Sequence, residues 1–469
     1  MLPQLRRLEE KYPDRLAVVG VHAGKYTAER STSNIRDAVL RLGIDHPVVN
    51  DRQFRIWKAY AVSAWPTVVI VGPNGYYLGT NPGEITFEDF DPVIASALAH
   101  FEQAGMISAA PLPLHPEHLD EPERPLRYPG KVLAVAGSDG TPDRLFIADS
   151  DHARVLGARL SVDGRAAEVE WVAGSGAPGA DDGPFEQAGF NRPQGMSLVA
   201  DTLYIADSEN HTLRALDTGK RTVRTIAGTG QIGRFGAAGG AALSTPLNSP
   251  WDLAWTGNRL YIAMAGYHQL WVYDPAGTVA PFAGTGREEL ADGRLWSPSV
   301  LKARVLDDLR GYASLAQPTG IVADGERLYF TCSEAQAVRS VSTGGENNVS
   351  TFVGTGLFDF GDKDGRGDAV RLQHPFGLAF HEGRLLVADT YNSKIKRLDP
   401  ATREAASWLG NGERGLVDGP GADARFNEPE GLSVAGNRLY IADTNNHAIR
   451  VVDLTDPAGN VSTLELRGL

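Results

Sequence analysis

Residues 436–454, GNRLYIADTNNHAIRVVDL, contain two short β-prone runs joined by turn-forming residues. The runs 439–441 and 449–452 are aliphatic and aromatic, whereas residues 443–447 favour turns, so the stretch predicts a β-hairpin. The same phrase recurs as LYIADSENHTLRAL and LLVADTYNSKIKRL, and more loosely in three further places. The six copies begin at Leu145, Leu203, Leu260, Leu328, Leu385 and Leu439. Six copies of one hairpin indicate a repeat architecture.

Each copy lies in a longer unit with fixed landmarks. A Pro-x-Gly step precedes most of the later hairpins, and a strand that ends in Gly-x-Gly follows them. The position of Asp149 in the first copy is taken in the later copies by Asp207, Met264, Cys332, Asp389 and Asp443. Each unit therefore supplies four short strands, and four-stranded units in a ring form a β-propeller. We predict six blades over residues 129–469, the first and last closing against each other by packing alone.

Composition limits the class of protein. Hydrophobic residues make up 42% and charged residues 22% of the 469 residues, as in globular proteins. No apolar run approaches the roughly 20 residues needed to span a bilayer. The first residues, MLPQLRRLEEKYPD, carry charges where a secretion signal needs an apolar core. Cys332 is the single cysteine, so an internal disulfide is excluded. These features predict a cytoplasmic protein with no membrane partner.

The net charge of −13 is concentrated in the repeats. Residues 1–105 hold 11 Lys and Arg against 12 Asp and Glu, whereas residues 106–469 hold 34 against 46. An acidic region repels phosphate backbones, so we expect no nucleic-acid partner.

The segment before the repeats alternates helical and strand patterns. Residues 3–12, 32–42, 54–60 and 87–105 predict helices, and residues 16–22, 68–71 and 76–79 predict strands, the first of them buried. Residues 106–128 are rich in proline and predict a semi-rigid linker. The predicted organisation is therefore an α/β domain over 1–105, a linker over 106–128 and an all-β propeller over 129–469.

Two motifs resemble known families. Trp65-Pro66-Thr67 followed by VVIVGPNG resembles the cis-proline segment of the thioredoxin fold, and LEEKYPDRLAVVGVHAGKY resembles thioredoxin-like proteins that carry NHL repeats. The hairpin phrase ADTxNxxI[KR], with Pro-x-Gly upstream, resembles the NHL repeat. The resemblance covers the whole chain. It implies a thioredoxin-like domain followed by an NHL-repeat propeller, with Trp65, Pro66 and Thr67 facing a redox site.

The chain departs from that family where the chemistry would lie. Active members carry Cys-x-x-C at the end of a strand, just before the helix that begins here at Pro3, and residues 1–105 contain no cysteine. Disulfide exchange needs a thiolate and a resolving thiol, so this sequence by itself predicts no oxidoreductase. The same resemblance implies a missing strand between residues 16–22 and 68–71. A segment upstream could supply it, the flanking strands could close together, or a partner could provide one; we favour the first.

Polar residues of the hairpins have structural and functional interpretations. The aspartates and the asparagines three residues on are typical turn caps. His211, His268 and His447 share one turn position, but equivalent points on neighbouring blades are expected about 10 Å apart, too far to share one zinc ion. Asp-Gly steps between blades are expected to be turns, with calcium binding as the alternative. No metal or cofactor is expected, and Cys332, which has no second cysteine to pair with, is expected to be a structural thiol.

One face of the propeller is the candidate binding surface. The longest connection, residues 287–316, contains Trp296 and a predicted helix over 298–309, and such loops are common places for binding. Trp251 and Asp252 replace the usual Pro-x-Gly content near the mouth of the channel. Trp251, Asp252 and Trp296, with the three turn histidines, are the candidate face.

Three functions remain open from the sequence. The first is a non-catalytic protein-interaction module. The second is a thiol-disulfide oxidoreductase whose Cys-x-x-C lies upstream of residue 1. The third is a hydrolase or lyase with a metal in the propeller channel, which is disfavoured because the inner strands are nearly all apolar. We favour an interaction module that binds a protein partner.

Overall fold

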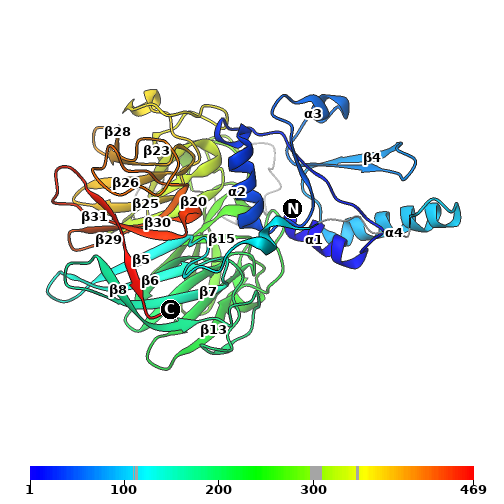
Figure 1. Cartoon of the computed structure of the whole chain (residues 1–469). Helices are drawn as coiled ribbons and strands as arrows, with labels where there is room; N and C mark the ends of the chain where they lie inside the picture. The colour runs from blue at the N-terminus through cyan, green and yellow to red at the C-terminus, as the bar shows by residue number, and fades with distance from the viewer. Residues whose placement is uncertain (109, 111–114, 296–308, 345–347) are drawn as a thin grey trace. The chain divides into compact units, whose positions relative to one another are not determined.

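The computed structural model describes residues 1–108, 110, 115–295, 309–344 and 348–469. The chain divides into two compact units, residues 1–123 and 124–469 (Figure 1). The sequence-based boundary at residue 105 therefore differs from the structural one, because residues 117–120 fold back onto the first unit. There the 3-10 turn η2 (Glu117–Asp120) packs against a helix, and Arg36 forms an ion pair with Glu117.

The first unit is a small α/β structure. All four predicted helices form, and Gly43 ends the second one in a left-handed conformation with φ of 56°. The strand β2 was not anticipated from the sequence. The elements are α1 (Leu2–Lys11), β1 (Gly20–His22), η1 (Ala28–Arg30), α2 (Thr32–Leu42), β2 (Val48–Asn50), α3 (Arg55–Ala59), β3 (Thr67–Val71), β4 (Tyr77–Pro82) and α4 (Phe87–Gln103).

The four strands of this unit form two separate sheets. β1 pairs in parallel with β2, and β3 pairs antiparallel with β4, while no pairing joins β1 to β3 among the described residues. The prediction of a buried strand over 16–22 is wrong: only residues 20–22 form a strand, and Val19 and Val21 are exposed. In the described part of the chain β1 pairs with a neighbouring strand on one side only, and the side chain of Val21 is left uncovered. The apolar residues of this run are therefore not all buried.

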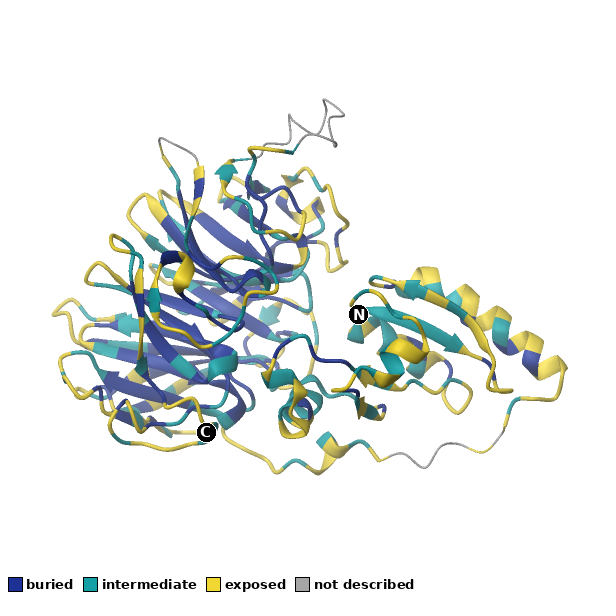
Figure 2. Ribbon diagram, turned by 90° about the horizontal axis from the view of Figure 1, so that it is seen from above, coloured by how far each residue is buried: buried dark blue, intermediate teal, exposed yellow. Residues whose placement is uncertain are grey.

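The core of the first unit lies on one side of the β3–β4 hairpin. Leu8 of α1 and Tyr12, which directly follows this helix, pack against Ile94 and Leu98 of α4, and Val68 and Ile70 of β3 pack on this cluster. Thr86 caps α4 by accepting a hydrogen bond from Asp89 N at 3.2 Å. Figure 2 shows that few residues of this unit are fully buried, in contrast to the strands of the second unit.

The second unit is a six-bladed β-propeller, as predicted. In each blade four antiparallel strands follow one another from the axis outward. Blade 1 contains β5 (Lys131–Ala136), β6 (Pro142–Asp149), β7 (Arg154–Leu160) and β8 (Ala166–Ala173). Blade 2 contains β10 (Pro193–Val199), β11 (Thr202–Asp207), β12 (Thr212–Asp217) and β13 (Thr222–Ala227). Blade 3 contains β15 (Pro250–Thr256), β16 (Arg259–Met264), β17 (Gln269–Asp274) and β18 (Thr278–Ala283).

The remaining blades repeat the plan. Blade 4 contains β20 (Pro318–Asp324), β21 (Arg327–Cys332), β22 (Ala337–Ser342) and β23 (Asn348–Val353). Blade 5 contains β25 (Gly377–His381), β26 (Arg384–Asp389), β27 (Lys394–Asp399) and β28 (Glu404–Leu409). Blade 6 contains β29 (Pro429–Ala435), β30 (Arg438–Asp443), β31 (Ala448–Asp453) and β32 (Val461–Thr463).

Most blades carry a short fifth strand on the outer edge. The preceding loop supplies it in blades 2 to 5, as β9 (Gly183–Pro184), β14 (Gly240–Ala241), β19 (Gly293–Arg294) and β24 (Gly365–Arg366). In blade 1 it is β33 (Glu465–Arg467), which pairs in parallel with β8. The expectation that the ring closes by packing alone is therefore wrong, because the end of the chain leaves blade 6 and joins blade 1. Covering outer edges leaves fewer unpaired backbone groups for unwanted strand pairing.

Hydrophobic packing joins neighbouring blades rather than filling one common centre. Six clusters of buried side chains form, and each draws its residues from two adjacent blades. The cluster that closes the ring places Leu145 and Ile147 of blade 1 against Tyr440 and Ala442 of blade 6. Burying one large aliphatic side chain is worth about 1.5–3 kcal/mol, so each seam is strongly favourable. No helix in the described part of the chain is long and apolar enough to cross a membrane.

Candidate functional site

In blades 2, 5 and 6 the turn between the second and third strands is built around a buried ion pair. In blade 2, Asp207 is fully buried and accepts hydrogen bonds from Asn191 N at 2.8 Å and from Asn210 Nδ2 at 2.8 Å. Arg214, also fully buried, donates from Nη1 to Asp207 at 2.9 Å and from Nη2 to Asp182 at 2.9 Å. Blade 6 repeats the arrangement with Arg450, Asp443 and Asp418. The hairpin aspartates are thus structural, as their spacing indicated.

The Asp-Gly steps between blades belong to this network. Asp182, Asp292, Asp364 and Asp418 each hold the buried cation of their blade, and each also accepts hydrogen bonds from a Thr or Ser on an outer strand. A carboxylate committed in this way has little capacity left for calcium. Across the described residues, no group of three or more His, Cys, Asp or Glu is placed to hold a metal ion.

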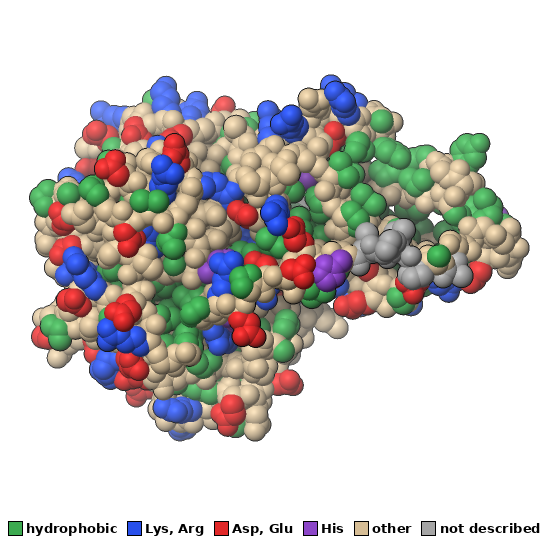
Figure 3. Space-filling view, viewed as in Figure 1, with side chains coloured by type: hydrophobic (Ala, Val, Ile, Leu, Met, Phe, Trp, Pro, Cys, Tyr) green, Lys and Arg blue, Asp and Glu red, His purple; other side chains and the backbone are tan. Residues whose placement is uncertain are grey.

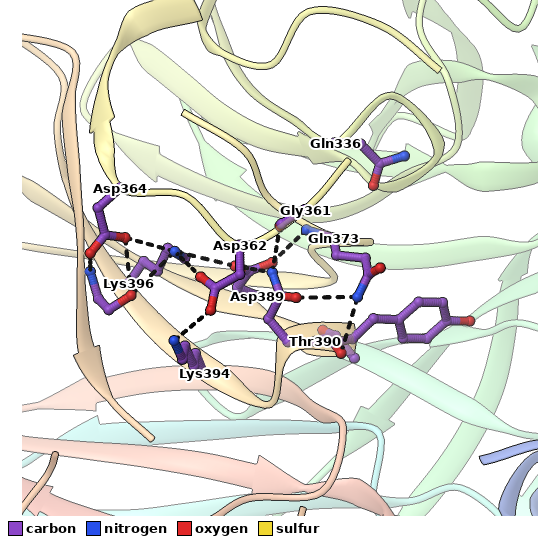
Figure 4. Close-up of polar contacts among 12 residues, drawn as sticks. Gln336, Gly361, Asp362, Asp364, Gln373, Asp389, Thr390, Lys394 and Lys396 are labelled. Atoms are coloured by element: carbon purple, nitrogen blue, oxygen red, sulfur yellow. Dashed lines mark hydrogen bonds and ion pairs between the residues drawn. The ribbon is translucent and has the colours of Figure 1, made fainter. Parts of the chain in front are cut away.

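Blade 5 carries a lysine where blades 2 and 6 carry arginine (Figure 4). Lys396 Nζ lies 2.7 Å from Asp362 Oδ1 and 2.7 Å from Asp364 Oδ1, but 3.7 Å from Asp389 Oδ2. Burial raises the pKa of Asp389 to about 7, despite the attraction of Lys396. Burial also raises the pKa of Asp207 and Asp443 to about 6, where an arginine is in direct contact. Of the three buried aspartates, Asp389 is therefore the least stabilised in its ionised form, because its lysine is farther away than the arginines of the other two blades.

Blades 3 and 4 depart from the motif in different ways. In blade 4 the aspartate is replaced by Cys332, and buried Arg339 keeps its bond to Asp292 while its Nη1 lies 4.0 Å from Cys332 Sγ. Burial raises the pKa of the Cys332 thiol, which favours an inert neutral group. In blade 3 both charges are absent, because Met264 and fully buried Trp271 take the two positions. Blade 1 keeps the buried aspartate, Asp149, which pairs with Arg154 at 2.8 Å because Leu156 takes the usual cation position.

The three turn histidines link neighbouring blades. Each has a left-handed backbone and accepts a hydrogen bond at Nδ1 from the residue just before the proline of the next blade. The donors are Ser249 N to His211 at 3.1 Å, Gln317 N to His268 at 3.2 Å and Tyr128 N to His447 at 3.2 Å. Burial lowers the pKa of His211, which keeps Nδ1 available as an acceptor. The structure gives all three a role in the seams between blades.

A hydroxyl group reinforces five of the six seams. The residue after the hairpin aspartate, or after Cys332 in blade 4, donates to the carbonyl of the next blade's proline, as in Ser333 to Pro375 at 2.9 Å and Thr444 to Pro129 at 2.9 Å. Ser150, Ser208 and Thr390 make the same bond. In blade 3 this position is Ala265, which has no hydroxyl. Thr444 closes the ring from blade 6 to blade 1 by the same contact.

The axis of the propeller carries a different polar contact. Lys131 of blade 1 and Asp252 of blade 3 form an ion pair at 3.2 Å, and their side chains are 5% and 14% exposed. Trp251 lies edge-to-face with Phe376 of blade 5, with ring centres 5.7 Å apart. A cavity of about 290 Å³ extends along the inner strands from this ion pair. Asp252 thus lines the axial cavity, and Trp251 beside it contacts blade 5.

The predicted face is not brought together as one site. The histidines lie in three separate seams, Asp252 is neutralised by Lys131, and Trp296 and most of the predicted helix 298–309 lie outside the described residues. The cations at the third strand were missed from the sequence, although the repeated Lys or Arg in ADTxNxxI[KR] marked them. Lys131 was missed because it replaces a glycine in a single blade.

In the first unit, the Trp65–Pro66 peptide bond is cis. Trp65 is 48% exposed and donates from Nε1 to Ala23 O at 2.8 Å. Its ring lies against Trp57, with centres 4.5 Å apart, and Phe54 completes the group. Thr67 donates to Ala64 O at 2.7 Å. This segment is an aromatic surface at the start of β3, with no titratable group among its three predicted residues.

Comparison with known proteins agrees with the repeat pattern. Residues 426–452 match the family model described as NHL repeat. The chain is 38% identical over 488 residues to Protein SUPPRESSOR OF QUENCHING 1, chloroplastic, of Arabidopsis thaliana, covering 100% of this chain and 44% of that protein. It is 37% identical over 490 residues to NHL repeat-containing protein 2 of Bos taurus, covering 97% of this chain and 64% of that protein.

A chain in the crystal structure of a nidogen/laminin complex aligns with a TM-score of 0.44 and 15% identity, over 69% of this chain and 93% of that one. The six blades and the matched repeat define this chain as an NHL-repeat β-propeller protein. It spans about half to two thirds of the length of the two relatives above.

The stability of blade 5 is expected to depend on pH through Asp389. In the folded protein the Asp389 carboxyl group has a pKa of about 7, whereas an aspartate in an unfolded chain has a pKa of about 3.9. The folded state therefore holds an extra proton between these values, so stability falls as pH rises from about 4 to about 7 and is then level. The quantity to compare is the free energy of unfolding of the wild type relative to that of Asp389→Asn, which lacks the titrating group. We expect this difference to fall by up to about 4 kcal/mol as the pH rises from about 4 to about 7. Denaturant unfolding of both proteins at several pH values measures it; a pH-independent difference would contradict it.

Cys332→Asp tests whether Arg339 is poised for a carboxylate. Arg339 is already desolvated, so the new aspartate recreates the pair of blades 2 and 6, and we expect stability within about 1 kcal/mol of wild type. The matched control is Met264→Asp, where Trp271 offers no cation and we expect a loss of about 3 kcal/mol or more. Thermal and denaturant unfolding measure both variants. Equal losses in the two would show that Arg339 does not hold the charge.

Proposed function

We propose that this chain is a non-catalytic protein-interaction module, in which a thioredoxin-like unit without redox cysteines precedes an NHL-repeat propeller that presents a binding face. The observation that carries this proposal is the exposed apolar surface of the first unit. Twelve of the twenty exposed large hydrophobic side chains in the described part of the chain lie in residues 1–123, although this unit holds only 123 of 469 residues.

These side chains are neighbours rather than scattered residues. Val21 of β1 pairs with Val49 of β2, and they are 43% and 40% exposed. Val71 of β3 pairs with Tyr77 of β4, and they are 44% and 54% exposed. Figure 3 shows hydrophobic side chains gathered on the unit around α3 and β4. Contiguous exposed apolar surface is typical of a site that another polypeptide covers.

The interior of the propeller supports a binding role over a catalytic one. Its buried aspartates, arginines and turn histidines are engaged in the blade turns and seams described above. A catalytic acid or base needs access to a substrate, and the fully buried Asp207, Arg214, Asp443 and Arg450 have none. The NHL-repeat fold thus serves here as a rigid scaffold, and its acidic balance favours a protein partner over a nucleic acid. A cytoplasmic location remains a prediction from the sequence; the Arabidopsis relative is named chloroplastic.

The alternative function is a thiol-disulfide oxidoreductase whose Cys-x-x-C lies in a segment preceding residue 1. Two observations favour it. β1 and β3 each have an unpaired edge, so an added strand could join them, and the alternative in which they pair with each other is not the arrangement found. Met1 packs in the same cluster as Val68 and Ile70 of β3, so a strand leading into α1 would arrive beside β3.

Insulin reduction separates the two functions. Because the single cysteine, Cys332, is fully buried, we expect this polypeptide not to accelerate insulin reduction by dithiothreitol. Thioredoxin is the positive control. Acceleration by this polypeptide would contradict the interaction proposal. Reading the genomic sequence upstream in frame completes the test: a Cys-x-x-C a few residues before Leu2, active in the extended protein and inactive with serines, would establish the alternative.

Charged substitutions test the exposed apolar surface. Val21→Lys and Tyr77→Lys place an ammonium group where a partner would bury it, so we expect at least a tenfold weaker complex, about 1.4 kcal/mol. The measurement is quantitative co-purification, from the source cells, of the proteins that bind the wild type. Val162→Lys is the matched control, because Val162 is 93% exposed in a turn of the propeller. Unchanged melting temperatures confirm folding, and equal retention by all three variants would contradict the surface assignment.

A further inference from the structure

The six blades meet at the axis through one position of the Pro-x-Gly step. Four blades place glycine there, where the backbones approach too closely for a side chain. A Cβ atom on Gly377 would lie 2.0 Å from Glu430 O, and one on Gly195 would lie 2.2 Å from Asp252 Oδ1. The other two blades place Lys131 and Asp252 at this position. The ring of blades therefore has room at its axis for these two side chains only because the other four blades contribute none.

The Lys131 ammonium group is fully coordinated by oxygen. Nζ donates to Asp252 Oδ2 at 3.2 Å, to Thr319 O at 3.0 Å and to Phe376 O at 3.1 Å. An ammonium group has three N–H donors, and all three are used. The acceptors come from blades 3, 4 and 5, whereas the lysine comes from blade 1. One buried cation thus joins four blades across the axis.

The acceptors are held in place independently of the lysine. Asp252 Oδ1 accepts from Leu253 N at 2.9 Å, and Oδ2 accepts from Ile321 N at 3.2 Å as well as from Lys131. Thr319 O and Phe376 O are backbone atoms at the starts of two inner strands. A carboxylate and two fixed carbonyl groups form a preorganised site for a cation that can donate three hydrogen bonds.

We propose that the axial end of the propeller is a binding site for a primary ammonium group, which this chain fills with its own Lys131 and which thereby locks the ring of blades. The ligand class is a primary alkylammonium ion, tethered in the native protein. Lys131 and Asp252 also line the 290 Å³ axial cavity. The inner strands place a collar of aliphatic side chains along that cavity: Val132, Met196, Leu253, Ile321, Leu378 and Leu432.

Chemical rescue tests this assignment. Lys131→Ala removes the ammonium group and opens space that n-propylammonium, the part of the side chain deleted, would refill through the cavity. We expect the melting temperature of this variant to drop by several degrees and to rise again with n-propylammonium concentration, because a ligand that binds only the folded state stabilises it. n-Propanol, of similar size without charge, and tetramethylammonium, without N–H donors, are expected to give no comparable rise.

Lys131→Met is the matched control, because methionine fills the space and supplies no charge. We expect a lower melting temperature than wild type and no response to n-propylammonium. Rescue of Lys131→Ala alone, by the primary amine alone, supports the proposal. Wild-type stability in Lys131→Ala, or equal stabilisation by all three additives, overturns it.

A measurement on the wild-type protein covers the case in which Lys131→Ala does not fold. An ammonium group bound by three oxygens exchanges its protons slowly, so nitrogen-15 spectra are expected to contain protected lysine ammonium signals from Lys131 and from buried Lys396. Asp252→Asn is expected to shift or remove one of them, and Asp362→Asn the other. The absence of a signal that responds to Asp252→Asn overturns the proposal.

Discussion

The buried pair between a hairpin aspartate and the cation seven residues along the chain is the interaction on which the turns of blades 2, 5 and 6 depend. Asp207 and Arg214 are both fully removed from solvent, which is unfavourable for each charge alone. The geometry compensates because every oxygen and both terminal nitrogens have partners, including the aspartate of the preceding loop. One ion pair therefore joins the hairpin, the third strand and the inter-blade connection. Loss of either charge would leave the other buried in a low-dielectric interior without an opposite charge.

Rigid turns make the seams between blades possible. Because the hairpin turn is fixed, its serine or threonine and its left-handed residue reach the next blade at constant positions. Thr444 and His447 make these contacts from blade 6 to the start of blade 1, so the ring closes with the same bonds that join its other blades. The C-terminal strand β33 adds a backbone pairing to this closure. Ala265 leaves the seam between blades 3 and 4 without the hydroxyl bond, although His268 still spans it.

The fold could be predicted because the repeat is periodic, whereas the polar contacts could not. Hairpin spacing and the Pro-x-Gly and Gly-x-Gly steps give the blade count, and the structure confirms six. Charge pairing depends on distances between blades that no local pattern contains, so Lys131 and Asp252, 121 residues apart, could not be paired from the sequence. For the same reason the turn histidines suggested a surface, whereas their ring nitrogens are engaged in three seams. The strand over 16–22 was overpredicted because an apolar run indicates burial only where something covers it.

The two units differ in how many of their strand edges and apolar side chains are covered by the unit itself. In the propeller, a fifth strand covers the outer edge of blades 1 to 5, and buried charged groups such as Arg214 and Lys131 bond to acceptors within the same unit. In the first unit, two sheets of two strands leave edges unpaired, and Val21 and Val49 face solvent as neighbours. Unpaired strand edges beside apolar side chains are the features that another strand or another protein can satisfy. Among the described residues, the first unit therefore offers the uncovered edges and apolar side chains that suit the proposed partner, beside any face that the propeller presents.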